Sequence, residues 1–300
     1  MTTKSSANLS QLPPRAGGVG YAQPAGRLQT WGRFVRFEHT LFSLPMLFAG
    51  VLLGAGAAVS GQLLLLVLLA GTGARTAALG LNRIIDRRLD AANPRTATRE
   101  LPSGAMSLRE AWGLTLLGAA VYAVAAGLID PLCLVLAPLP LAVFIAYPYL
   151  KRATAWCHLG VGLGLAMAPL GGFFAARLSF DGAAPALLLA CFTLGWVAGF
   201  DIIYSTLDEA HDRDTGLRSL PARYGRDTAL TISRVLHAAA WGCLAALVMV
   251  RLAWPAVPFL LLVGAFLIWE QRKADDLDLA FFRINVWVGL AALATVAAGI

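Results

Sequence analysis

Charged residues are scarce in this 300-residue chain, at 14% of the sequence, whereas hydrophobic residues make up 58%. A soluble domain carries about 25% charged residues, so the composition argues against a soluble globular protein. The formal net charge of +7 does not indicate a nucleic-acid partner, because the basic residues fall in short loops between apolar runs, as in membrane proteins. The sequence therefore predicts an integral membrane protein with many spans.

Cysteine and histidine are also scarce, with four of each. No two cysteines have the spacing of a metal or redox motif, and we interpret all four as small buried apolar residues. The histidines show no mutual spacing that indicates a metal site. Residues 1–30 are polar and rich in Gly, Pro, Ser and Gln. We expect no cleavable signal peptide there but a disordered cytosolic tail.

Nine apolar runs follow the tail, each near the ~20 residues that a helix needs to cross the hydrocarbon. The predicted spans are 40–58, 62–85, 108–128, 131–149, 155–176, 184–207, 227–250, 255–270 and 281–299. The predicted fold is thus an all-α integral membrane bundle of nine transmembrane helices. One set of loops carries almost all the basic residues and the opposite set holds only Arg177 and Arg251. This asymmetry places the N-terminus in the cytosol.

Polar side chains at four-residue intervals follow two of these apolar runs. Asn82, Asp86 and Asp90 form a first ladder after the second run, and Asp208 and Asp212 form a second ladder after the sixth. On a helix this spacing stacks the side chains on one face, successive members ~6 Å apart. A charge run at a helix end is usually a solvated face. Carboxylates at the edge of a membrane are costly, however, unless cations hold them, and hard divalent cations bind such oxygen ligands.

A buried charge precedes each ladder. Arg75 and Asp201 each lie seven and eleven residues before two members of the following ladder, which is close to whole numbers of helical turns. Each should therefore share the face of its ladder, deeper in the membrane. Tyr204 lies on the same face as Asp201. Matched spacing in two helices, on one side of the membrane, favours a functional site over two solvated faces.

The chemistry that suits two facing carboxylate ladders is diphosphate binding through Mg²⁺, because paired carboxylates leave coordination sites for phosphate oxygens. Arginines follow both ladders: Arg95 and Arg99 the first, Arg218 and Arg223 the second. Their guanidinium groups suit phosphate, although membrane topology alone would also place arginines there. A diphosphate at the cytosolic surface above an apolar tunnel describes a polyprenyl diphosphate lying in the membrane lipid.

These motifs resemble those of the UbiA family of membrane aromatic prenyltransferases, and in particular its 4-hydroxybenzoate polyprenyltransferase branch. The first ladder matches the family's Asn-x3-Asp-x3-Asp motif and the second its Asp-x3-Asp motif. The segments 99–104 and 147–152 also resemble family segments, and the likeness covers about residues 31–300. Glu100 replaces a proline common in the first segment, and Arg218 stands where many members carry lysine.

The resemblance implies a helical bundle around a central cavity that opens to the cytosol and the bilayer, in the inner (cytoplasmic) membrane. It further implies Mg²⁺-dependent transfer of a polyprenyl group to a small aromatic acid, with 4-hydroxybenzoate favoured, as in ubiquinone-type quinone biosynthesis. Asp201 is the expected catalytic residue, binding or deprotonating the phenol. The expected metal ligands are Asn82, Asp86, Asp90, Asp208 and Asp212; the diphosphate ligands are Arg99, Lys151, Arg218 and Arg223; the aromatic-substrate residues are Arg152, Asp201, Tyr204 and Arg75.

Alternatives stay open both within the family and outside it. Within the family, the acceptor could be a hydroxynaphthoate of menaquinone biosynthesis, and the haem O synthase and chlorophyll synthase activities also stay open. In another class, Asp201 and Arg75 could form the intramembrane relay of a secondary transporter. The acidic residues cluster at one membrane surface, which argues against a transport path that opens to both sides of the membrane.

Overall fold

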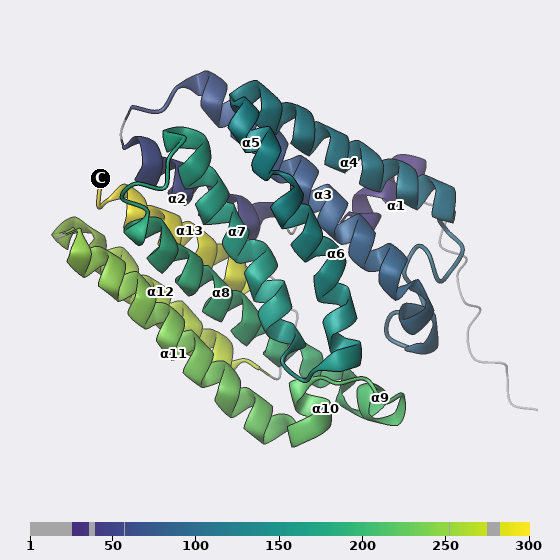
Figure 1. Ribbon diagram of the computed structural model, residues 1–300. Helices are drawn as coiled ribbons and strands as arrows, with labels where there is room; N and C mark the ends of the chain where they lie inside the picture. Colours follow the sequence, from purple (N-terminus) through teal and green to yellow (C-terminus); the bar gives the residue numbers. More distant parts are fainter. Residues whose placement is uncertain (1–25, 36–39, 57, 252, 275–282) are drawn as a thin grey trace, which may run out of the picture.

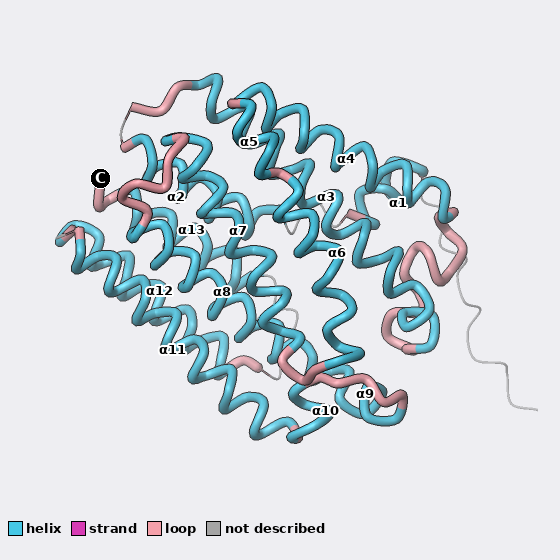
Figure 2. Tube along the Cα trace, in the orientation of Figure 1, coloured by secondary structure: helices cyan, strands magenta, loops and turns pink. Residues whose placement is uncertain are grey.

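The structure, a computed structural model, describes residues 26–35, 40–56, 58–251, 253–274 and 283–300. Most of the expected tail lies outside these residues. The described part is almost entirely helical and contains no strand (Figure 2). Its helices are α1 (Arg27–Phe34), α2 (Thr40–Ala55), α3 (Gly61–Ala92), α4 (Leu108–Ile129), α5 (Pro131–Leu136), α6 (Pro138–Ala153), α7 (Cys157–Arg177), α8 (Ala184–Ser205), α9 (Glu209–Asp214), α10 (Leu220–Tyr224), α11 (Arg226–Val250), α12 (Val257–Arg272) and α13 (Asn285–Ala297), with two 3-10 turns, η3 (Thr206–Asp208) and η4 (Trp254–Ala256).

Seven helical stretches of the described chain are long and apolar enough to cross a membrane, and they correspond to seven of the nine predicted spans. The other two predicted spans, 40–58 and 281–299, contain the shorter apolar helices Ser43–Ala55 and Asn285–Ala297. At 1.5 Å per residue each of these reaches about 20 Å, which is less than the ~30 Å hydrocarbon thickness. The all-helical fold is therefore confirmed for the described residues, with seven candidate membrane spans, and the count of nine stays a prediction.

The fourth predicted span is broken, which the apolar run alone did not show. The chain forms two helices, α5 and α6, that meet at Ala137. Proline stands at the start of each, as Pro131 and Pro138, because a proline lacks the N–H that the first turn of a helix leaves unused. Leu136 and Leu139, on either side of Ala137, both line the apolar cavity that is described below.

Helix α2 packs against α7 with direct backbone contact. A Cβ atom added to Gly50 would lie 2.1 Å from the carbonyl oxygen of Pro169, and one added to Gly172 would lie 2.1 Å from that of Leu47. Any side chain at these glycines would therefore push the two helices apart. Because α2 also contributes Leu47 to the cavity wall, this close contact fixes the position of that part of the wall against α7.

Helix α8 lies at the centre of the bundle, between α7 and α11 (Figure 1). Its membrane segment is 72% buried inside the protein, the largest share among the seven candidate spans of the described chain. Trp196 is fully buried, and its indole N–H donates to Asn285 Oδ1 of α13 at 2.6 Å. Helix α8 is thus a fixed support for the side chains at its C-terminal end, including Asp201.

Candidate active site

Helix α3 carries all three members of the first ladder on one continuous helix. The Asn82 side-chain amide donates to Asp86 Oδ2 at 3.2 Å, which shows that the two side chains share a face. Asp86 and Asp90 are 3% and 6% exposed. Carboxylates this buried require partners, and basic side chains from two other segments supply them.

Asp86 accepts hydrogen bonds from both basic residues at the end of α6. Lys151 Nζ lies 2.6 Å from Asp86 Oδ2, and Arg152 Nη2 lies 3.1 Å from Oδ1. Asp90 is paired with Arg99 of the following loop, at 2.7 Å from Nη1 to Oδ1. Three residues expected to bind substrate are therefore in direct contact with the first ladder. Arg152, expected at the aromatic acceptor, lies at the level of this ladder.

The second ladder does not continue α8 as one regular helix, contrary to the spacing argument. The 3-10 turn η3 separates α8 from α9 and includes Asp208, whereas Asp212 lies in α9. The hydroxyls of Ser205 and Thr206 donate to the carbonyl oxygens three residues before them, at 2.8 and 2.7 Å. These local bonds compete with the regular helical pattern and favour the tighter turn. Asp208 and Asp212 therefore belong to two different helical segments, and the phase of one continuous α-helix does not extend from one to the other.

The two ladders meet through the loop that follows α3. Asn93 Nδ2 donates to Asp208 Oδ1 at 2.7 Å, and Arg95 binds both oxygens of Asp208 through Nε and Nη2. Arg95 Nη1 also donates to the Tyr204 hydroxyl at 2.8 Å, and its guanidinium lies over the Tyr204 ring. Burial lowers the pKa of Arg95, but the Asp208 and Tyr204 contacts outweigh it and raise the pKa above its usual value. Sequence reasoning named Arg95 only as a loop arginine suited to phosphate and did not single out Asn93, so the pairing of both residues with Asp208 was missed.

The remaining basic residues lie in the segment after α9. The Arg218 backbone N–H donates to the Lys151 carbonyl oxygen at 2.7 Å, so the segment is tied to the end of α6. The Arg218 side chain donates to the Ala153 carbonyl oxygen, also at 2.7 Å. Arg223 is exposed, with its guanidinium over the Tyr224 ring. Figure 1 shows α9 and α10 together at this end of the bundle, close to the end of α6.

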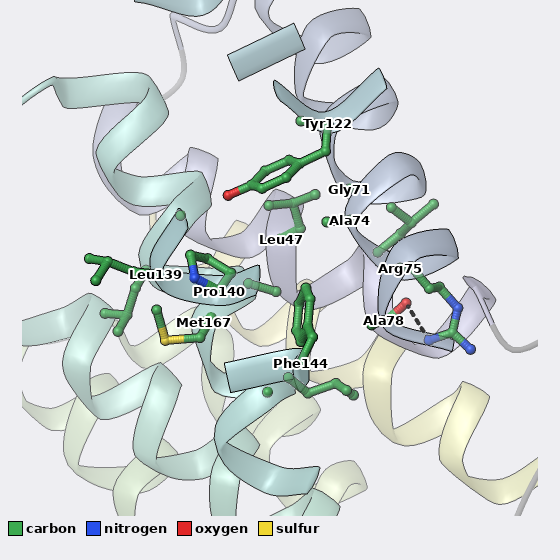
Figure 3. A pocket seen from close by; sticks show the side chains of 18 of the residues that line it. Leu47, Gly71, Ala74, Arg75, Ala78, Tyr122, Leu139, Pro140, Phe144 and Met167 are labelled. Carbon is green, nitrogen blue, oxygen red and sulfur yellow. Dashed lines mark hydrogen bonds between the residues drawn. The ribbon is translucent and has the colours of Figure 1, made fainter. Parts of the chain in front are cut away.

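A cavity of about 520 Å³ is lined by residues of α2 to α8, and its walls are mostly apolar. Figure 3 shows Leu47, Phe144 and Met167 around it, with Arg75 at its edge donating to the Ser43 hydroxyl at 3.4 Å. Asp201 also lines the cavity. The two charges expected below the ladders are thus brought to one apolar chamber. Tyr204 and Arg152 are not among its lining residues and lie at the ladders.

Asp201 has a partner that sequence reasoning missed. His158, at the start of α7, lies with Nδ1 2.7 Å from Asp201 Oδ2 and is 3% exposed. The signal available in the sequence was a histidine in the first turn of an apolar span, at the same end of the bundle as both ladders. Taken without the fold, a lone histidine gave no reason to connect it with a residue 43 positions away.

The ladder residues have the chemistry of a magnesium site but are not preassembled as one. Within the described ranges, no three His, Cys, Asp or Glu side chains converge closely enough to hold a metal ion. Instead Asp86, Asp90 and Asp208 are each neutralised by a basic side chain. Their carboxylate oxygens are the ligands that Mg²⁺ prefers. The residues fit Mg²⁺ if the ion and a diphosphate bind together, so that the basic side chains turn from the carboxylates to the phosphate oxygens.

The signature of the UbiA prenyltransferase family matches residues 43–296. The chain belongs to the UbiA prenyltransferase family. This match shows that the protein is a transferase, which removes the support for a transporter. A curated relative, the 4-hydroxybenzoate octaprenyltransferase of Polaromonas sp., is 30% identical to this prenyltransferase over 234 residues, covering 74% of this chain and 79% of the relative.

Solved structures agree with this membership. The apo structure of a UbiA homolog from Aeropyrum pernix K1 is 37% identical, covers 86% of this prenyltransferase and 96% of its own chain, and superposes with a TM-score of 0.79. A UbiA homolog from Archaeoglobus fulgidus, solved bound to GPP and Mg²⁺, is 20% identical, covers 90% and 98% of the two chains, and has a TM-score of 0.69. At that identity the second likeness shows the fold alone.

Proposed function

We propose that this prenyltransferase moves a polyprenyl group from a polyprenyl diphosphate to a small aromatic acid, with 4-hydroxybenzoate as the acceptor. The observation that carries the proposal is the arrangement of charge. Two carboxylate ladders joined by Asn93 and Arg95 lie at one end of an apolar cavity, and Asp201 and Arg75 lie in the cavity itself. The name of the Polaromonas relative supports the choice of acceptor.

The ladders would hold the diphosphate end of the donor. Asn82, Asp86, Asp90, Asp208 and Asp212 would bind Mg²⁺, which neutralises charge on the leaving diphosphate. That a UbiA homolog of the same fold, from Archaeoglobus, was solved with GPP and Mg²⁺ supports the choice of ion but not of individual ligands. The basic side chains now paired with the acids would turn to the phosphate oxygens, with Arg218 and Arg223 available beside them. This exchange replaces each internal ion pair by one carboxylate–metal and one cation–phosphate contact.

The cavity would hold the prenyl chain and the acceptor ring. The allylic C–O bond of the donor breaks and diphosphate leaves with the bonding electrons. The ring carbon ortho to the hydroxyl then forms the new C–C bond, and the proton on that carbon is lost. The apolar walls exclude water, which would otherwise capture the allylic cation. Asp201 would bind or deprotonate the phenol, and Arg75, which shares the cavity with it, would bind the acceptor carboxylate.

Arg152 is less suited to the acceptor than Arg75 in this conformation. It donates to Asp86 Oδ1 at 3.1 Å and to the carbonyl oxygen of Pro148 at 3.0 Å, and its guanidinium lies over the Tyr149 ring. These contacts place it beside the proposed metal ligands, so we assign Arg152 to the diphosphate. The ladder residues would then bind the diphosphate of the donor, and the cavity residues would bind the aromatic acceptor. The active-site end faces the cytosol in this proposal, in the inner membrane.

The test uses purified protein in detergent with Mg²⁺, geranyl diphosphate and radiolabelled 4-hydroxybenzoate, and it scores the label that enters an apolar product. We expect product with Mg²⁺ and none with excess EDTA. A parallel reaction replaces the acceptor by a hydroxynaphthoate. If only the hydroxynaphthoate gives product, the protein would be assigned to menaquinone biosynthesis instead. If no acceptor or donor gives product, the proposal would be refuted.

A further inference from the structure

A buried histidine links the proposed acceptor site to the segment that follows the second ladder. His158 lies at the start of α7 and is 3% exposed. Its Nδ1 atom is 2.7 Å from Asp201 Oδ2, and its Nε2 atom is 3.4 Å from the backbone nitrogen of Leu220 at the start of α10. One imidazole ring therefore contacts a cavity side chain and a loop backbone at the same time.

The Leu220 contact determines which ring nitrogen carries the proton. A backbone N–H can only donate, so in the neutral ring Nε2 accepts from Leu220 and carries no hydrogen. The hydrogen of the neutral ring is then on Nδ1, where it points at Asp201. Asp201 Oδ2 is consequently the acceptor of this hydrogen bond. Among the described residues Oδ1 has no hydrogen-bond partner, and the side chain is 25% exposed, toward the cavity.

The backbone around Leu220 is fixed by independent contacts. Ser219 caps α10 by accepting from the Ala222 N–H, and the Leu217 N–H donates to the carbonyl oxygen of Asp212 in the second ladder at 2.8 Å. The residue before His158, Cys157, lies with Sγ 3.5 Å from the Arg218 carbonyl oxygen. The start of α7 is therefore docked on this segment. The ring orientation of His158 depends on the segment that also positions Asp212.

We infer that His158 is a positioning residue for Asp201 in the prenyl-transfer reaction. It fixes the rotamer of the carboxylate, keeps Oδ2 occupied by a ring N–H, and leaves Oδ1 to accept the acceptor's phenolic hydrogen. The inference rests on the proposed function, in which Asp201 binds the acceptor. It adds that the loop after the second ladder and the acceptor pocket are connected through one side chain.

The test compares His158→Leu with His158→Gln in the Mg²⁺-dependent transfer reaction, with the apparent KM measured for each substrate. Outer-shell hydrogen-bond partners of this kind typically contribute 10–100-fold. We expect His158→Leu to lower kcat/KM for the aromatic acceptor by about this factor, with the KM for the prenyl diphosphate changed less than about twofold. His158→Gln should restore part of the loss, because its amide can donate to Asp201 and accept from Leu220.

A double-mutant cycle with Asp201→Asn separates positioning from a general packing role. If His158 acts through Asp201, then adding His158→Leu to Asp201→Asn should cause little further loss. Wild-type acceptor kinetics in His158→Leu, equal losses for both substrates, or additive losses in the cycle would each overturn the inference. If His158→Leu does not fold, His158→Asn replaces it. The shorter amide cannot reach both partners, so activity equal to that of His158→Gln would also overturn the inference.

Failure of this inference differs from failure of the proposed function. An inactive wild-type protein with all acceptors and donors would reject the prenyl-transfer assignment itself. An active wild-type protein with unaffected His158 variants would reject only the positioning role.

Discussion

Replacing Asp86 by asparagine tests whether the paired charges of the first ladder have a function beyond stability. Asp86 accepts charged hydrogen bonds from Lys151 and Arg152, and its side chain is 4% exposed, whereas the two basic side chains are 30% and 35% exposed. Removing one partner of a fully buried ion pair costs about 3–5 kcal/mol. Because water reaches both cations here, we expect Asp86→Asn to destabilise the metal-free protein by about 2–4 kcal/mol.

The same substitution should remove stabilisation by substrate. Ligand at a hundred times its Kd stabilises the folded state by about 2.7 kcal/mol. The eight tryptophans supply a fluorescence signal for thermal unfolding in detergent. We expect geranyl diphosphate with Mg²⁺ to raise the apparent unfolding temperature of the wild type, with neither component effective alone. Asp86→Asn should unfold at a lower temperature and show no rise with ligand.

Glu209→Gln is the matched control. Glu209 lies beside the second ladder but pairs with exposed Arg213 in the same helix, at 2.6 Å from Oε1 to Nη2. Such pairs contribute about 0.3–0.5 kcal/mol, so this variant should keep both its stability and its response to ligand. A normal ligand response in Asp86→Asn would refute the assignment of Asp86 to the metal and diphosphate. Loss of the response in Glu209→Gln would show that the effect is not specific to the ladders.

Three further substitutions test other parts of the account. Arg75→Met should raise the KM for the aromatic acid roughly tenfold to a hundredfold, the value of a lost charged hydrogen bond, with the donor KM unchanged in steady-state kinetics. Phe180→Ala should increase activity with longer donors relative to geranyl diphosphate in a competition assay. Phe180 lines the cavity and stacks on Phe174 at 4.7 Å between ring centroids, so the two rings form part of the cavity wall. Gly172→Ala should destabilise the protein by about 1–3 kcal/mol in thermal unfolding, because its Cβ would meet the Leu47 carbonyl oxygen.

Each of these expectations can be contradicted. An unchanged acceptor KM in Arg75→Met would remove Arg75 from the acceptor site. An unchanged donor preference in Phe180→Ala would show that the prenyl chain does not reach this wall. Wild-type stability in Gly172→Ala would mean that α2 and α7 can separate without cost. Exposed Phe259→Ala, outside the cavity lining, is the control for the loss of a phenyl ring.

The membrane class and most of the helices followed from hydrophobic length alone. This worked because a transmembrane helix must satisfy its own backbone groups, so a long apolar run has few alternatives. The two helices that fell short, α2 and α13, are 16 and 13 residues long. Their neighbouring residues are partly outside the described ranges, and apolar length gave no precise helix ends. The break at Ala137 was missed because Pro138 and Pro140 lie within an otherwise continuous apolar run.

Four-residue spacing predicted the first ladder well, since α3 continues without interruption through Asn82 and Asp90. The same reasoning was only partly right for the second ladder, because Ser205 and Thr206 bond back to the chain and introduce a 3-10 turn. Helical phase also predicted that Arg75 and Asp201 lie deeper than their ladders on the same helix faces. In the structure both residues line one cavity.

Residue spacing could not predict contacts between segments that are far apart in the sequence. Arg95 and Asp208 are 113 positions apart, and His158 and Asp201 are 43 apart. A single sequence gives no signal that joins such pairs. The basic residues were predicted by type to be diphosphate ligands, but their pairing with the acids in the metal-free protein required the structure. That pairing is what leads us to expect an exchange of partners when Mg²⁺ and diphosphate bind together.

Binding of radiolabelled geranyl diphosphate shows whether both ladders form one site for Mg²⁺ and diphosphate. Retention of the label by detergent-purified protein is measured with Mg²⁺ or with EDTA, in the wild type, Asp86→Asn and Asp208→Asn. We expect Mg²⁺-dependent retention that inorganic diphosphate displaces and that both variants lose. Retention that is indifferent to EDTA, or that survives the loss of either carboxylate, would contradict this expectation.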